Sequence, residues 1–348
     1  MSEVKKVKNN YNKKEIKIAF IADDIKVLNK FGIEHNTTFA LMLAAQKFSI
    51  KNLNVRIFLT NTPSLKIENG KVCSVFDEVL VRKKHNNHLT IIRSQIYNLE
   101  SMDIIFARKD PPVDQSYLSF VQSLLLVPHF KNGLFKKQSN KNILIINSPE
   151  GILHANEKLY AFNFPELLPP TIVTSSKSEA LDFLKVHKEA VIKPLFNKGG
   201  EGVFCIKIGS KHASQIINSS IRKNFKIIVQ KYLPQVIQGD KRILLLNGNP
   251  IGGIVRIPRK GEFRAHISRG ARYKKLSFSK NDLKICRKLR TQLIRDGLYF
   301  VGIDVIGRYL IEINVTCPAN LSETAISNKK LLAEKIVQWA ISTICLKM

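Results

Sequence analysis

The order of apolar runs and helical segments constrains the fold of this chain more than any other feature. Before residue 150, apolar runs that suit buried strands alternate with segments that suit helices. We predict strands over 16–22, 53–59, 104–107 and 143–146, and helices over 37–48 and 114–127. Helices are the usual crossovers between parallel strands. The first half therefore predicts an α/β domain with a doubly wound parallel sheet.

The pattern changes after Asn147-Ser148-Pro149, where strands become more frequent. We expect strands over 171–174, 190–194, 203–208, 227–232, 241–247, 251–257, 299–306 and 309–315. Helices are expected over 149–161, 178–187, 211–223, 279–294 and 329–343. Short links such as the turn at Asn247-Gly248 favour a mixed α+β arrangement. Two domains follow, residues 1–150 and 151–348.

The chain has 56 Lys+Arg and 27 Asp+Glu among 348 residues, a formal net charge of +29. No apolar run approaches the roughly 18 residues of a membrane span, so no membrane role is expected. Five scattered cysteines without a Cys-x-x-Cys pair indicate a reducing, cytoplasmic location. The charge leaves open a nucleic-acid-binding protein, because residues 256–275 hold eight Lys/Arg and one acid.

Three oxygen donors mark the expected strand pair 299–306 and 309–315. The tight turn at Gly307-Arg308 predicts antiparallel pairing, which places Asp304 and Glu312 on adjacent strands. Glu312 and Asn314 share one face because side chains alternate with a period of two. Such hard ligands suit Mg²⁺. Solvated surface carboxylates are the alternative, disfavoured because both acids lie among Ile, Val and Leu.

Basic residues in the second half suggest a phosphate site. Lys193 lies in an apolar strand, and the Gly-rich loop after it, with Lys198, Gly199 and Gly200, can direct backbone N–H groups at phosphates. Arg242 and Arg256 lie in apolar strands of the domain with the acids, where two guanidinium groups can clamp a phosphoryl group or a carboxylate. The alternatives are an ordinary turn and surface salt bridges.

The chain resembles the prokaryotic glutathione synthetase family, with its ATP-grasp fold, along nearly its whole length. The resemblance is carried by stretches in family order: NTTFALMLAAQ, RKDPPVD, INSPEGILHANEKLYAFNF, VIKP, VQKYLP, GDKRILLLNGNPI, RIPRKGEFR, GLYFVGIDVIG and EINVT. It implies a pre-ATP-grasp substrate domain followed by an ATP-grasp domain with a lid subdomain over about 165–232. The Gly-rich loop and the segment after Arg264 depart from the family pattern.

The resemblance also implies roles for residues that match the family motifs. The implied ATP-binding residues are Lys158, Lys193, Lys198, Gly199, Gly200, Gln230, Lys231, Tyr232 and Leu233. The implied substrate-binding residues are Thr37, Thr38, Arg108, Lys109, Asp110 and Arg264. Catalytic roles fall to Arg242 and Arg256, and the metal ligands are Asp304, Glu312 and Asn314.

The implied reaction joins γ-glutamylcysteine to glycine with ATP and Mg²⁺ or Mn²⁺, through an acyl phosphate. An acyl phosphate must be shielded from water, so a closing loop is expected, either residues 197–202 or 259–275. The resemblance suggests a homo-oligomer, commonly a tetramer, and no specific nucleic-acid partner. Two alternatives stay open: another ATP-grasp carboxylate–amine ligase, and a basic nucleic-acid-binding relative that has lost catalysis.

Overall fold

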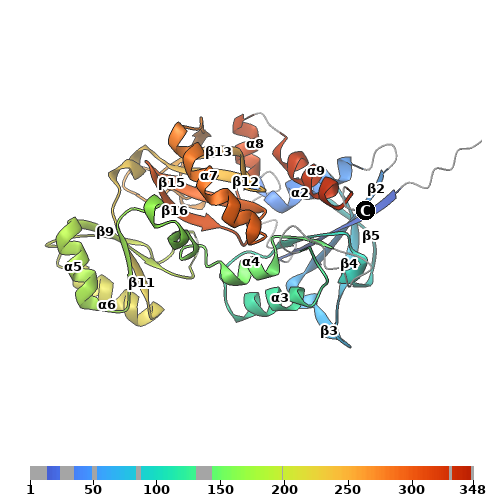
Figure 1. Cartoon of the computed structure of the whole chain (residues 1–348), viewed down its shortest axis with the longest axis horizontal. Coiled ribbons are helices and arrows are strands. Elements are labelled where there is room, and N and C mark those ends of the chain that lie inside the picture. Colours follow the sequence, from blue (N-terminus) through green and yellow to red (C-terminus); the bar gives the residue numbers. More distant parts are fainter. Residues whose placement is uncertain are drawn as a thin grey trace, which may run out of the picture.

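The computed structural model describes residues 14–23, 35–48, 53–83, 88–130, 143–197, 199–328 and 331–345. Within these residues the chain forms three sheets that follow one another along the long axis of the molecule (Figure 1). The N-terminal sheet lies at one end, a five-stranded sheet in the middle and a four-stranded sheet at the other end. No helix in the described part of the chain is long and apolar enough to cross a lipid bilayer.

The N-terminal sheet has a parallel core in the order β2-β1-β6-β7. Its strands are β1 (Lys14–Ala22), β2 (Leu53–Asn61), β6 (Ile104–Arg108) and β7 (Leu144–Ile146). Alternate β1 residues face opposite layers: Phe20 packs in the cluster of helix α2 (Thr37–Lys47), and Ile21 in that of α3 (Gln115–Leu125). Both faces are therefore covered, and the predicted doubly wound parallel sheet is confirmed.

Three antiparallel strands extend this sheet where no element was predicted. They are β3 (Lys66–Glu68), β4 (Lys71–Val81) and β5 (Leu89–Asn98). β4 pairs with β2, β3 and β5. Most of β5 is exposed, so its sequence lacks the buried alternation by which a strand is recognised.

The four-stranded sheet is antiparallel, in the order β10-β9-β11-β8. It consists of β8 (Thr171–Thr174), β9 (Glu189–Pro194), β10 (Phe204–Lys207) and β11 (Ile227–Lys231), with helices α5 (Lys177–His187) and α6 (Ala213–Asn224). Leu184 and Ile217 of the helices pack with Ile192 and Val229 of the sheet in a separate small core. This unit occupies the predicted lid subdomain, and its movement as a lid stays a prediction.

The five-stranded sheet is antiparallel, in the order β14-β13-β12-β15-β16. Its strands are β12 (Asp240–Leu246), β13 (Asn249–Ile257), β14 (Arg272–Lys275), β15 (Phe300–Ile306) and β16 (Tyr309–Asn314). One face packs against α7 (Lys280–Arg295), which begins at a capping box formed by Ser279 and Asp282. The short strand β14 was not predicted.

The other face of this sheet packs against helices from both ends of the chain. Helices α8 (Leu321–Asn328) and α9 (Leu332–Cys345) share a hydrophobic core with α2. The helix expected over 329–343 is α9, and the preceding helix α8 was not predicted. One hydrophobic core therefore joins segments near the start and the end of the chain. The predicted domain boundary near residue 150 stays a prediction.

The helix expected over 149–161 is shorter in the structure, where α4 spans Pro149–His154. The Asn156 side chain accepts hydrogen bonds from the backbone N–H groups of Lys158 and Leu159, at 3.1 and 3.0 Å, and turns the chain. The turn brings residues 156–158 to the five-stranded sheet. Short 3₁₀ segments complete the fold at Thr62–Ser64, Leu99–Ser101, Tyr160–Asn163, Pro165–Leu167, Pro234–Gln238 and Ile267–Arg269.

Candidate functional site

A cavity of about 820 Å³ is lined by residues of all three sheets and their loops. The sequence-predicted site residues that line it are Thr37, Thr38, Arg108, Asp110, Lys158, Lys193, Gly199, Gly200, Gln230, Lys231, Tyr232, Leu233, Arg242, Arg256, Arg264, Asp304, Glu312 and Asn314. Lys109 does not line the cavity; its Nζ lies 3.8 Å from Asp23 Oδ1. Lys198 lies outside the described residues.

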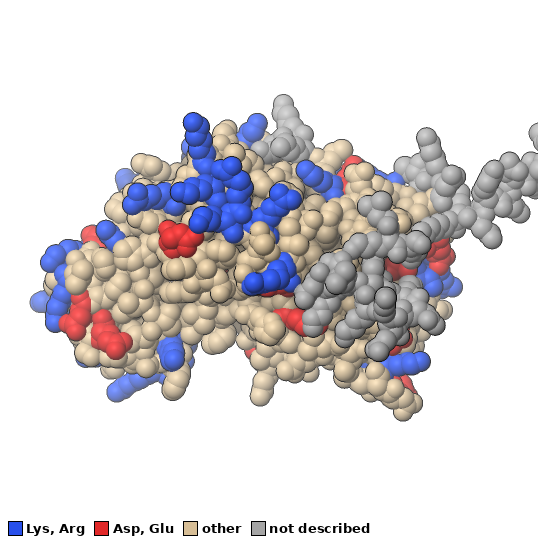
Figure 2. Space-filling view, viewed as in Figure 1, with Lys and Arg blue, Asp and Glu red and all other residues tan. Residues whose placement is uncertain are grey.

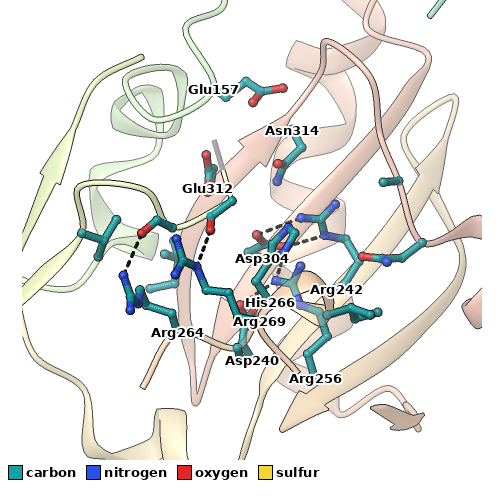
Figure 3. A pocket seen from close by; sticks show the side chains of 18 of the residues that line it. Glu157, Asp240, Arg242, Arg256, Arg264, His266, Arg269, Asp304, Glu312 and Asn314 are labelled. Carbon is teal, nitrogen blue, oxygen red and sulfur yellow. Dashed lines mark hydrogen bonds and ion pairs between the residues drawn. The ribbon is translucent and has the colours of Figure 1, made fainter. Parts of the chain in front are cut away.

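Asp304 is the centre of the buried ion-pair cluster in this cavity (Figure 3). Arg242 binds it at two points, Nε to Oδ1 at 2.6 Å and Nη2 to Oδ2 at 3.1 Å. Arg256 Nη2 lies 3.0 Å from Asp304 Oδ1 and donates to Asp240 Oδ2 at 2.6 Å. The strand register sets this arrangement, because Arg242 pairs with Asp304 and Asp240 pairs with Arg256 across β15-β12-β13.

The cluster joins two guanidinium groups to two buried carboxylates. Burial alone would raise the pKa of Asp304, but Arg242 and Arg256 outweigh it and hold that pKa well below its usual range. Burial, with the nearby charge of Asp304, raises the pKa of Asp240 to about 6 although Arg256 opposes the shift. Two permanent guanidinium charges therefore face two carboxylates, and burial disfavours the charged form of one of them, Asp240. Such a group suits a further anion, such as a phosphoryl group.

Glu312 and Asn314 lie on β16, next to Asp304 of the neighbouring strand β15, as the predicted strand pairing requires. Asp304 and Glu312 are direct partners across β15 and β16, which confirms that pairing. Asn314 Nδ2 donates to Gly302 O at 3.1 Å, which leaves its amide oxygen as the available ligand atom. No cluster of three or more His, Cys, Asp and Glu able to hold a metal occurs among the described residues, and the assignment of Asp304, Glu312 and Asn314 as metal ligands stays a prediction.

The turn after α4 places Glu157 and Lys158 next to the end of β16. Lys158 Nζ lies 3.5 Å from Glu312 Oε1 and donates to Asn197 O at 2.7 Å. Glu157, which sequence reasoning missed, accepts from the backbone N–H of Val315 and of Thr316, at 2.9 and 3.0 Å. Burial, then the charge of Glu312, raises the pKa of Glu157. In the sequence, only its position next to Lys158 indicated that Glu157 lies in the cavity.

Lys193 extends from β9 toward the neighbouring strand β11. Its Nζ donates to Gln230 Oε1 at 2.7 Å, and Gln230 Nε2 donates to Thr171 Oγ1 at 3.0 Å. Burial lowers the pKa of Lys193 to about 8. The segment Lys231-Tyr232-Leu233 follows at the end of β11 and lines the same part of the cavity. These residues fit an anionic ligand with an apolar ring system.

Two loops from different sheets meet over the cavity (Figure 3). Arg269 Nε donates to Gly199 O at 2.8 Å, and Arg264 Nη1 donates to Gly200 O at 3.2 Å. Both glycines have positive φ, +62° and +72°, which favours glycine at these positions. The loop holding Gly199 and Gly200 and the loop of residues 262–270 are thus linked. Arg269 was missed because it has no counterpart in the family pattern.

His266 and Arg264 belong to the same loop but differ in their surroundings. Burial, then the charges of Arg256 and Arg242, lowers the pKa of His266 to about 4, so its ring is neutral at neutral pH. Arg264 also binds Glu262, and this hydrogen bond lowers the pKa of Glu262 to about 2. The loop therefore adds positive charge through Arg264 and Arg269 rather than through His266.

The N-terminal wall of the cavity is built around the start of α2. Arg108 Nε donates to Thr38 Oγ1 at 3.3 Å, and Arg108 Nη2 to Pro318 O at 3.1 Å. Thr37 Oγ1 accepts from the backbone N–H of Leu321 at 3.4 Å. These bonds join β6, α2 and α8, and the predicted substrate residues Thr37, Thr38 and Arg108 come together here.

A dense group of basic side chains lies on the outer surface over α7 (Figure 2). The exposed basic residues of α7 are Lys280, Lys284, Arg287, Lys288, Arg290 and Arg295. They lie on the helix face opposite Ile285 and Leu289, which pack in the core. This part of the net charge belongs to a solvated helix face rather than to the cavity.

The fold is shared with solved structures of low sequence identity. D-cycloserine synthetase DcsG matches with a TM-score of 0.63 at 13% identity, covering 94% of this chain and 99% of that one. D-alanyl-alanine synthetase A from Vibrio cholerae matches with a TM-score of 0.57 at 11% identity, covering 96% and 99%. The chain therefore shares the fold of these two synthetases.

The family follows from the sequence comparisons. The family described as prokaryotic glutathione synthetase matches with its N-terminal domain over residues 16–152 and its ATP-grasp domain over residues 157–329. A glutathione synthetase of Gloeobacter violaceus is 36% identical over 327 residues, 94% of this chain and 97% of its own length. One of Coxiella burnetii is 33% identical over 310 residues, 88% and 91%. The chain belongs to the prokaryotic glutathione synthetase family.

The resemblance, the fold class and the ligase activity predicted from the sequence are thus confirmed. The activity is ATP-dependent ligation in glutathione synthesis, with ATP as substrate. The comparisons favour neither another ATP-grasp ligase nor a nucleic-acid-binding relative that has lost catalysis.

Proposed function

We propose that this enzyme joins γ-glutamylcysteine to glycine in the cavity described above. The dipeptide's cysteinyl carboxylate attacks the γ-phosphorus of ATP, and ADP leaves. The amine of glycine then attacks the acyl phosphate, loses a proton and displaces phosphate. The observation that carries this proposal is the convergence of Lys158, Lys193, Arg242 and Arg256 on the acidic strand pair in one cavity.

The residues supply what phosphoryl transfer requires, which is positioning and charge neutralisation. Lys158 and Lys193 bind the phosphates, with Gly199 and Gly200 covering them, and residues 230–233 bind the adenine ring. Arg242 and Arg256 stabilise the charge of the transferred phosphoryl group and orient the attacking carboxylate. Arg264 holds the covering loop against the substrate, and Asp110 completes the N-terminal wall, with Lys109 behind it beside Asp23.

The donor set of Asp304, Glu312 and the amide oxygen of Asn314 fits Mg²⁺ or Mn²⁺, because all three atoms are hard oxygens on one sheet edge. A divalent ion held there neutralises phosphate charge on ATP. Because Asp304 also binds both arginines, an ion held by it would lie beside the groups that we propose to hold the phosphoryl group.

The test is phosphate release with ATP, Mg²⁺, γ-glutamylcysteine and glycine. We expect release that requires both the dipeptide and glycine, with glutathione formed in equal amount. Release without glycine dependence, or with a different amino acid preferred from a panel, would reassign the acceptor. We further propose a cytoplasmic homo-oligomer, commonly a tetramer in this family; the free cysteines suit a reducing compartment. Sedimentation analysis checks the oligomeric state.

A further inference from the structure

Glu323, in the first turn of α8, is a buried carboxylate that the mechanism above does not use. It is 3% exposed and lines the cavity. Its Oε1 lies 3.2 Å from His35 Nδ1, while its Oε2 has no hydrogen-bond partner among the described residues. A buried carboxylate oxygen without a donor is costly, so a ligand that supplies an N–H group is stabilised there.

Three other acids of the cavity have a lysine or arginine close by. Asp304 and Asp240 each lie 2.6 Å from an arginine nitrogen, and Glu312 lies 3.5 Å from Lys158. The ion pair recorded for Glu323 is with the imidazole of His35, whose side chain is half exposed. Among the described residues Glu323 has no ion pair with a lysine or arginine, so it is suited to a cationic group of a ligand.

A buried cation stands in the same wall as Glu323. Arg108 is 4% exposed and reaches Pro318 O, five residues before Glu323. Thr37 and Thr38, at the start of α2, join Arg108 to the first turn of α8 through their hydroxyl groups. One buried anion and one buried cation in a single wall are the complement of an amino-acid zwitterion.

We propose that Glu323 binds the α-ammonium group of the γ-glutamyl donor and that Arg108 binds its α-carboxylate. This assignment rests on the proposed function. The acceptor glycine is also a zwitterion, but its amine must lose a proton to attack. A carboxylate beside that amine would favour its charged, unreactive form, whereas the glutamyl ammonium stays charged throughout the reaction. Glu323 therefore suits the donor.

The test compares two donors on two enzymes. The donors are γ-glutamylcysteine and glutarylcysteine, which lacks only the α-amino group. The enzymes are the wild type and Glu323→Gln, which removes the charge with little change in shape. We expect the wild type to prefer γ-glutamylcysteine by about tenfold to a hundredfold in kcat/KM, as for a charged hydrogen bond. Glu323→Gln should lose most of this preference by a higher KM for γ-glutamylcysteine, with KM for ATP and for glycine unchanged.

The control variant is Glu334→Gln, which removes a carboxylate of α9 that pairs with Lys47 outside the cavity. It should keep the wild-type preference. Equal use of both donors by the wild type overturns the proposal without any variant, so a poorly folded Glu323→Gln does not block the test. The proposal is also overturned if Glu323→Gln lowers kcat/KM equally for γ-glutamylcysteine and glutarylcysteine. It is overturned as well if the variant raises KM for glycine instead of KM for γ-glutamylcysteine. No turnover with either donor would overturn the proposed function itself.

Discussion

Arg242 and Asp304 are direct partners across two antiparallel strands, and their side chains form a two-point ion pair of 2.6 and 3.1 Å. Both side chains are buried. The same carboxylate also meets Arg256, which Asp240 binds as well, so Asp304 is the one acid in contact with both guanidinium groups of this cluster. Asp304 thus has a structural role in addition to the metal ligation that we propose for it.

Asp304→Asn should therefore affect both activity and stability. Loss of the carboxylate leaves two buried guanidinium groups without a full counter-charge, so we expect the free energy of unfolding to fall by about 3 kcal/mol. Turnover should fall by at least ~100-fold, because a metal ligand and the orientation of both arginines are lost. Denaturant unfolding and phosphate release measure the two effects.

Glu312→Gln is the matched control for Asp304→Asn. Glu312 is 24% exposed and its basic neighbour Lys158 is 3.5 Å away, so its removal should cost less than about 1 kcal/mol of stability. Turnover should still fall strongly. If Asp304→Asn were as stable as the wild type, the structural role of its ion pairs would be wrong.

The apparent affinity for ATP should depend on pH through Lys193. Burial lowers the pKa of Lys193 to about 8, so the side chain is charged below pH 8 and loses its proton above it. Because ATP is a polyanion, it binds the charged form more tightly. KM for ATP should be constant at lower pH and rise by up to about tenfold per pH unit once the pH is above 8.

Lys193→Arg keeps its charge at every accessible pH. Its KM for ATP should show no such rise, whatever its value at neutral pH. The measurement is steady-state kinetics from pH 6.5 to 9.5 (roughly one unit or more on either side of the Lys193 pKa). A wild-type KM that does not change over this range would contradict the assignment of Lys193 to the phosphates.

Arg269→Met should loosen the link between the two loops over the cavity. Arg269 donates to Gly199 O at 2.8 Å, and this charge-assisted bond holds the glycine loop against residues 262–270. We expect KM for ATP to rise by about tenfold. Water should also reach the acyl phosphate more often, so phosphate release should exceed glutathione formation.

Arg272→Met, which removes an exposed charge from β14, is the matched control. It should keep phosphate release equal to glutathione formation. Tight coupling in Arg269→Met with an unchanged KM would show that the two loops close without this bond.

The basic face of α7 should assist capture of anionic substrates without taking part in catalysis. Lys284 and Arg287 are exposed and lie outside the residues that line the cavity. Replacing both by Glu should lower kcat/KM for ATP by about twofold to tenfold in about 0.05 M salt and leave kcat unchanged. The difference from wild type should disappear at about 0.5 M salt, where charges are screened. A lower kcat would contradict a purely electrostatic role.

Much of the architecture was predictable because strongly periodic segments report burial directly. Strand β1, the strand pair β15–β16 and helix α7 all occur where the sequence predicts them, within one or two residues. Strand β5 was not predictable because most of its side chains are exposed. Helix α4 was expected to be longer because the competing turn depends on side-chain hydrogen bonds of Asn156.

The sequence by itself determined the family, the alternation of elements and the residue types of the cavity. These properties depend on short sequence motifs and on their order along the chain. Only the tertiary structure decided which of these residues meet: Arg242 with Asp304, 62 positions apart, and Arg269 with Gly199, 70 positions apart. It also showed that Glu323 is buried in the cavity wall. Such contacts depend on sheet register and helix packing, which local sequence patterns do not encode.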